Sequence, residues 1–152
     1  MPGEGVGAIG CRIGADAHSG VVHTVEVTAA NVSDVVMTGE LLHGNEDDVY
    51  ADAGYIGAEK RDELKDLDVT WNTAEKRSKI TAMEDGPLKG LSKRAEQIKA
   101  RIRARVEHPF HVVKDLFGHR KLRYRGLKKN RVQLQVMFAL ANLVITKKTL
   151  LA

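Results

Sequence analysis

The stretch DVYADAGY, Asp48–Tyr55, decides the predicted fold because it joins a short strand to an acid and a glycine. Val49 and Tyr50 give residues 48–51 the character of a strand, and Asp52 and Gly54 follow directly. In α/β proteins the carboxyl ends of strands open onto the crevice that binds ligands. Asp52 is therefore a candidate for an active-site wall, although an Asp that caps a turn gives the same pattern.

The residues upstream of this stretch predict a hairpin and a helix. Cys11–Ala15 is short and apolar, and Val21–Thr28 (VVHTVEVT) is rich in β-branched residues. Residues 17–20 have the composition of a turn, so the two segments predict an antiparallel hairpin. Asn31 or Ser33 can cap a helix that runs to about residue 43.

The residues downstream continue the alternation of strands and helices. Ala58–Leu67 predicts a helix and Val69–Trp71 a short strand. The resulting order β, β, α, β, α, β over residues 10–72 is typical of the α/β class.

The second half of the chain predicts helices. Residues 73–90 are polar and predict a loop, and residues 91–118 predict a long helix. Pro109 removes a helical hydrogen-bond donor, so we expect a kink or break near His108. Residues 119–152 predict a basic loop followed by a final helix over 132–150.

Charge is divided between the two halves of the chain, which the net value of +4 conceals. Residues 1–85 hold 7 Lys and Arg against 17 Asp and Glu, and residues 86–152 hold 17 against 3. The halves therefore carry net charges of −10 and +14. A strongly basic half favours a polyanionic partner such as nucleic acid, with ribosomal or acidic-protein contacts as alternatives.

Other residue types exclude several classes of protein. The single cysteine, Cys11, excludes an internal disulfide and a thiolate zinc site, and His108, His111 and His119 lack zinc-site spacing. The sequence has no secretory signal at residues 1–10 and no apolar run of about 18 residues. We therefore expect a cytoplasmic protein that does not contact a membrane.

Two further patterns are candidates for phosphate chemistry. On a continuous helix Glu107 lies about 40° and Lys114 about 20° from Arg103, so one acid and two cations share a face. An ordinary ion pair between Arg103 and Glu107 explains the same spacing. The second pattern is a dense basic run that could neutralise DNA phosphates or could be a solvated loop: Arg120, Lys121, Arg123, Arg125, Lys128 and Lys129.

Taken together, these residues resemble the bacterial insertion-sequence DDE transposases, of the insertion-sequence four/five superfamily. Asp52, Gly54 and Tyr55 are similar to the second-acid motif of that family. The spacing of Arg103 and Lys114 about Glu107 is similar to its Tyr–Arg–Glu–Lys signature, whose Glu is the third acid. Further phrases that resemble the insertion-sequence-five branch stand at residues 29–34, 106–110 and 138–143.

The resemblance implies a ribonuclease H-like α/β fold with C-terminal helices, but two positions depart from the family pattern. Ala100 stands where the signature has its tyrosine, and the first catalytic acid is missing. In the family that acid lies on the first, central strand, upstream of our predicted hairpin, and Asp16 in the hairpin turn is a poor substitute. We therefore expect an incomplete fold that begins after this strand, with exposed sheet edges. A pseudogene-like fragment, a split or frameshifted product, or half of a complemented pair are the alternatives.

The resemblance also implies a mechanism and partners. Three carboxylates of the family hold Mg²⁺ or Mn²⁺, so Asp52 and Glu107 would be metal ligands, and Arg103 and Lys114 would hold DNA phosphate. The partners would be the terminal repeats and target DNA, with a homo-oligomer or a partner transposase chain. We expect this chain to be inactive alone. The alternatives are a non-catalytic DNA-binding fragment that modulates a full-length transposase, and a basic protein of structured RNA or ribosomes.

Overall fold

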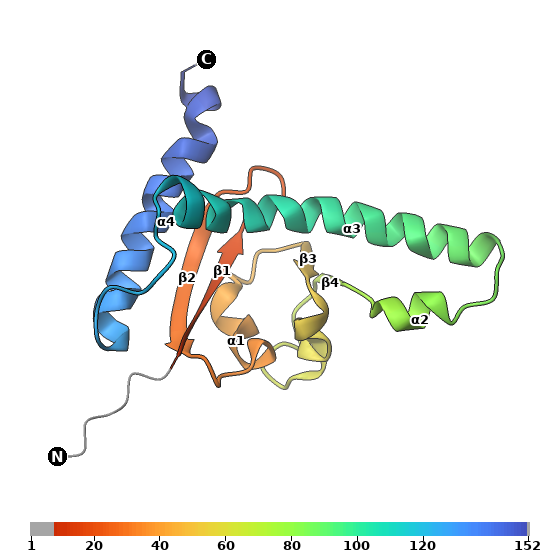
Figure 1. Ribbon diagram of the computed structural model, residues 1–152. Coiled ribbons are helices and arrows are strands. Elements are labelled where there is room, and N and C mark those ends of the chain that lie inside the picture. Colours follow the sequence, from red (N-terminus) through yellow and green to blue (C-terminus); the bar gives the residue numbers. More distant parts are fainter. Residues whose placement is uncertain (1–7, 152) are drawn as a thin grey trace.

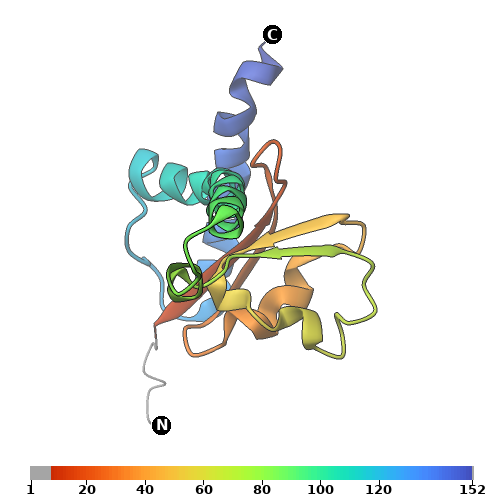
Figure 2. The ribbon, with the colours of Figure 1, turned by 90° about the vertical axis from the view of Figure 1, so that its right-hand side faces the viewer.

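The computed structural model describes residues 8–151 and is a mixed α/β fold with two small sheets (Figure 1). Each sheet has two strands, ordered β1–β2 and β3–β4, and helices cover them. The long helix α3 runs across both sheets, and α4 lies against β2 on the side away from β3 (Figures 1 and 2). The α/β class predicted from the sequence is confirmed.

The first sheet is the predicted hairpin. β1 (Ile9–Ala15) and β2 (Val22–Ala29) pair antiparallel with Ile9 opposite Ala29, and the register shifts between Gly14 and Ala15. The hairpin forms because apolar residues alternate along both strands, which buries Ile13, Val22 and Val27 against the helices.

The second sheet carries the stretch that ends at Asp52. The helix α1 (Asp34–Leu41) follows the hairpin and leads to β3 (Asp48–Ala51), which pairs in parallel with β4 (Thr70–Thr73). The connection holds two single 3₁₀ turns, η1 (Ala53–Tyr55) and η2 (Ala58–Lys60). The strand predicted around residue 50 is confirmed.

The helix predicted over Ala58–Leu67 is wrong. Only η2 and a series of turns occupy this range, and the backbone of Arg61 is extended, with ψ 142°. Of these ten residues only Ala58 and Leu64 are buried, so an α-helix here would gain little from packing.

The second half is helical, as predicted, with different boundaries. α2 (Arg77–Thr81) and the first turn of α3 (Pro87–His111) lie within the range predicted as a loop. Pro87 is tolerated because the first helical residues need no donor. After a loop, α4 runs over Leu127–Leu150, so the basic segment is partly helical.

The break expected near His108 does not occur there. α3 continues through the buried Pro109 to His111, and the π-helical segment η3 (Val112–Leu116) follows. The Phe117 N–H donates to the Val112 carbonyl at 3.0 Å, which is the wide turn of a π-helix. The helix continues past Pro109, which has no N–H to donate, and its hydrogen-bond pattern becomes that of a π-helix from Val112.

The core lies between the hairpin, η3 and α4. Phe138 of α4 is 1% exposed and meets the Phe110 ring edge-on, with the ring centroids 5.2 Å apart. Asn142 of α4 also bonds to β2: it accepts from the Val22 N–H at 2.8 Å and donates to the Val22 carbonyl at 2.7 Å. These contacts hold the hairpin in place beside α3. No helix in residues 8–151 is long and apolar enough to cross a membrane.

Candidate active site

A cavity of about 850 Å³ lies between the two sheets, with β1 on one side and β3 on the other. α1 and α3 supply further walls. Asp52, Arg103 and Glu107 all line this cavity. Three of the candidate residues therefore border the same cavity, although 55 residues separate Asp52 from Glu107 in the chain.

Asp52 follows the last residue of β3 and is exposed. One carboxylate oxygen, Oδ1, accepts from the Gly54 N–H at 2.8 Å and so caps η1. The two sequence interpretations of this residue, a turn cap and a cavity wall, thus hold at the same time. The cap fixes one oxygen and leaves the carboxylate at the mouth of the cavity.

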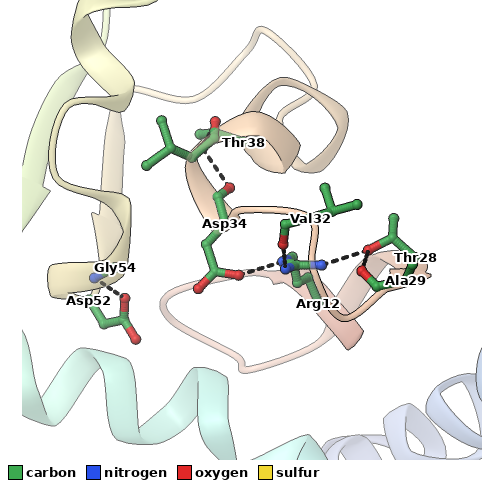
Figure 3. A network of polar contacts seen from close by, with 9 residues as sticks. Arg12, Thr28, Ala29, Val32, Asp34, Thr38, Asp52 and Gly54 are labelled. Atoms are coloured by element: carbon green, nitrogen blue, oxygen red, sulfur yellow. Dashed lines mark hydrogen bonds and ion pairs between the residues drawn. The ribbon is translucent and has the colours of Figure 1, made fainter. Parts of the chain in front are cut away.

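Steric crowding explains why a glycine, Gly54, stands two residues after Asp52. A Cβ atom on Gly54 would lie 3.0 Å from Oδ1 of Asp52 and 3.1 Å from Oδ2 of Asp34. Gly54 therefore lets its backbone pass beside two carboxylates. The same distances place Asp34 beside Asp52, which sequence analysis did not identify (Figure 3).

Asp34 is held by Arg12 of β1 (Figure 3). The Arg12 Nε donates to Asp34 Oδ1 at 2.5 Å, another nitrogen donates to Thr28 Oγ1 at 2.8 Å, and the third donates to the Val32 carbonyl. The Arg12 side chain is only 10% exposed, and each of its three nitrogens has a hydrogen-bond partner within the fold. The sequence feature that could have pointed to this ion pair is Arg12, a lone charged residue in an otherwise apolar strand.

Tyr55 lies next to both acids. Burial raises the pKa of its hydroxyl to about 12, and the negative charges of Asp34 and Asp52 act in the same direction. The tyrosine therefore stays protonated at neutral pH beside the two carboxylates.

Glu107, Arg103 and Lys114 differ in their exposure and in the helical segment that carries them. Glu107 is exposed and Arg103 half-buried on the cavity side of α3. Lys114 belongs to η3, and its Nζ lies 5.6 Å from the centre of the Phe110 ring. Lys114 does not line the cavity. Of the three residues predicted to share one helix face, only Arg103 and Glu107 therefore border the cavity.

Two positions singled out for their departure from the family pattern take ordinary structural roles. Asp16 accepts from the N–H and the hydroxyl of Ser19 at 2.6 Å each, and the hydroxyl hydrogen bond lowers the pKa of Asp16. Its carboxylate therefore caps the hairpin turn at the cavity rim. Ala100 is exposed on α3 and offers no polar atom in its side chain.

The donor chemistry of the cavity fits part of a divalent metal site. Carboxylate oxygens are the ligands that Mg²⁺ and Mn²⁺ prefer, and Asp52 and Glu107 supply them. Across residues 8–151 no group of three or more His, Cys, Asp or Glu side chains is placed to hold a metal ion. Within these described residues, Asp52 after β3 and Glu107 on α3 therefore make up an incomplete ligand set.

The basic segment lies elsewhere. Figures 1 and 2 place residues 118–129 on the opposite side of the hairpin from β3 and β4. Its cations are all exposed: Arg120, Lys121, Arg123, Arg125, Lys128 and Lys129. The Arg120 guanidinium pairs with Asp115 at 2.6 Å.

Asn130 shapes this segment and was not identified from the sequence. It is 0% exposed, and its side-chain amide donates to the carbonyls of Tyr124 and Gly126 at 2.8 Å each. The loop that carries the cations is thereby tied to the first turns of α4.

A family model described as a transposase DDE domain matches residues 2–143. The chain therefore belongs to this family, which confirms the resemblance to DDE transposases. Transposases act on DNA, and DDE enzymes generally use divalent metal ions. No solved structure matches the chain.

Proposed function

We propose that the cavity is part of the catalytic site of an insertion-sequence transposase, of the insertion-sequence four/five group, with a ribonuclease H-like fold. The observation that carries the proposal is that Asp52 and Glu107 line one cavity although they lie on different elements. The DNA partners would be the terminal repeats and a target, and the protein would work in the cytoplasm as a homo-oligomer or with a partner transposase chain.

In this proposal each residue has a distinct role. Asp52 and Glu107 would hold Mg²⁺ or Mn²⁺, which when bound supplies Lewis-acid activation of a phosphodiester. Arg103, half-buried on α3, also lines the cavity, where it would offset the charge of the two carboxylates and hold a phosphate. Lys114 would contact the DNA backbone beyond the cavity, because a lysine acts as a mobile point charge.

A third carboxylate is needed to complete the ligand set. Asp34 lies beside Asp52, but it is paired with Arg12. Asp16 is committed to its turn. We therefore propose that the third acid comes from a segment outside residues 8–151, and that the chain has no strand-transfer activity alone.

The test is cleavage of labelled DNA that carries the terminal repeats, with Mg²⁺ and the purified chain. The expected result is no cleavage by the chain alone. Cleavage should appear when a polypeptide with the complementary strand and acid is added, and Asp52→Asn or Glu107→Gln should abolish it. Robust cleavage by the chain alone would contradict the need for a third acid, and full activity of either variant would contradict the assigned ligands.

A second candidate is a non-catalytic DNA-binding fragment that modulates a full-length transposase. The separation of the basic segment from the cavity favours it, because phosphate contact there needs no metal site. This candidate predicts DNA binding whose affinity falls with salt, with a slope that decreases by about 0.9 for each lysine or arginine contact removed. Lys128→Ala would lower that slope, whereas Asp52→Asn would leave DNA binding unchanged.

A further inference from the structure

The charged residues of α3 are divided between two sides of the helix. α3 has seven lysines and arginines but only two acids. At 100° per residue, both acids lie within about 40° of Arg103. The other three arginines, Arg94, Arg101 and Arg105, lie within about 20° of the side directly opposite Arg103. These three residues, called the arginine row below, therefore share one side of α3 with no acid among them.

The arginine row is exposed and contributes little to the fold. Arg94, Arg101 and Arg105 are all exposed. Two lysines of α3 pair with acids at 2.8 and 3.0 Å, but within residues 8–151 no acid forms a salt bridge with an arginine of this helix. The Arg105 guanidinium donates to the Ala17 carbonyl at 3.4 Å, which is long for a hydrogen bond. Because like charges four residues apart destabilise a helix, the row is not explained by stabilisation of α3.

The arginine row leads along α3 to the candidate active site. Figure 1 shows the first half of α3 reaching past β3 and β4, with α2 beside it. At the other end of the row, Arg105 lines the same cavity as Asp52 and Glu107. Eleven residues separate Arg94 from Arg105, so the row is about 16 Å long, the length of about five base pairs. A duplex whose reacting phosphodiester lies in the cavity therefore has room to run along the row.

We propose that Arg94, Arg101 and Arg105 bind the phosphates of duplex DNA next to the cavity. The planar guanidinium of arginine donates two parallel N–H groups to phosphate oxygens, which makes it better suited to this contact than lysine. Contacts of this kind position a duplex without reading its sequence. The choice of DNA as the ligand rests on the proposed function, whereas the row itself rests on the geometry of α3.

The arginine row is distinct from the basic segment of residues 118–129. That segment follows η3, beyond the C-terminal end of α3. Arg94 lies 17 residues before His111, the last residue of α3, which is about 25 Å along the helix axis. The two basic regions therefore contact different parts of a bound duplex, and each can be removed without the other.

The experiment measures how the affinity of the full chain for DNA depends on salt. The probe is a fluorescently labelled duplex of about 20 base pairs and arbitrary sequence, roughly 70 Å long, which is long enough to cover the row. Fluorescence anisotropy gives the binding constant between about 0.05 and 0.3 M salt. EDTA is present throughout, so that metal binding plays no part in the result.

Arg94→Ala and Arg101→Ala are the test variants. Each phosphate contact contributes about 0.9 to the slope of log affinity against log salt concentration. Each variant should therefore reduce this slope by about 0.9 and weaken binding by about eightfold at 0.1 M salt, and the double variant should reduce the slope by about 1.8. Both side chains are exposed, so the thermal unfolding midpoint should stay unchanged and the loss reports the contact.

Lys93→Ala is the matched control. Lys93 is exposed and precedes Arg94 in the sequence, but it lies about 100° away around the helix. Its replacement removes the same charge from the same turn and should leave the slope unchanged. An unchanged slope in the double arginine variant would overturn the proposal. An equal loss for Lys93→Ala would also overturn it, because the attraction would then come from the whole basic helix.

A second comparison separates the arginine row from the proposed function. In an Asp52→Asn background, Arg94→Ala should reduce the slope by the same amount, because the row binds DNA without the metal site. Slopes that change as expected while the cleavage assay fails would support the row and count against the catalytic proposal. Cleavage together with unchanged slopes would count against the row alone.

Discussion

Replacement of Asn142 by leucine tests how α4 holds the hairpin. Asn142 satisfies both backbone groups of Val22, at 2.8 and 2.7 Å, and Val22 is 7% exposed. Leucine has a similar size but no polar atoms, so it leaves a buried N–H and a buried carbonyl without partners. Each such group costs about 1–3 kcal/mol. The two groups together cost about 2–6 kcal/mol and the added apolar contact of leucine offsets about 1 kcal/mol, so we expect a net loss of roughly 1–5 kcal/mol.

Urea denaturation followed by far-UV circular dichroism measures this loss. The midpoint should fall while the slope with urea stays the same, because the area exposed on unfolding does not change. Gln135→Leu is the matched control, since Gln135 is exposed on the same helix and its replacement should change the free energy of unfolding by less than about 0.5 kcal/mol. A loss for Asn142→Leu as small as that of the control would refute the reasoning.

Three further outcomes follow from the packing and the titrating groups. Gly14→Ala should lower the free energy of unfolding by about 1–3 kcal/mol in the same assay, because its Cβ would lie 2.7 Å from the Leu41 carbonyl oxygen; an unchanged midpoint would contradict this. Phe138→Ala removes the ring that packs on Phe110 and should lower the free energy of unfolding by about 3–5 kcal/mol. A loss below about 1 kcal/mol would contradict this packing role. Burial lowers the pKa of His23 below its ordinary value of 6.5, so the unfolded chain binds the proton more readily. Stability should therefore be full above about pH 6.5 and fall as the pH drops below it. His23→Asn should flatten that dependence in denaturation curves at several pH values.

The local sequence pattern was sufficient to predict the elements that bury one regular face. The hairpin follows from its β-branched residues and the strand before Asp52 from Val49 and Tyr50, and both were confirmed. The helix expected over residues 58–67 failed because charged residues dominate that range. Pro109 was expected to kink or break the helix near His108, but α3 continues through this buried position to His111.

Contacts between distant residues could not be predicted from local pattern. The bond between Asn142 and Val22 joins residues 120 positions apart, and the pair of Arg12 with Asp34 joins residues 22 apart. Their partners are set by the packing of α4 and α1 on the sheets, which propensity does not encode. The roles of Asp52 and Glu107 were inferred from the family resemblance and remain a proposal.

The most direct measurement of the central claim is an NMR titration of the chain with Mn²⁺. The paramagnetic ion broadens signals of nuclei close to it, so the amide signals of Gly54 and Glu107 report on the two proposed ligands. The account predicts that both signals broaden at the same Mn²⁺ concentration, and that Asp52→Asn or Glu107→Gln reduces the broadening of both, while the exposed control Asp66→Asn does not. Broadening of one signal without the other, or loss of one ligand without effect on the other, would contradict a shared metal site.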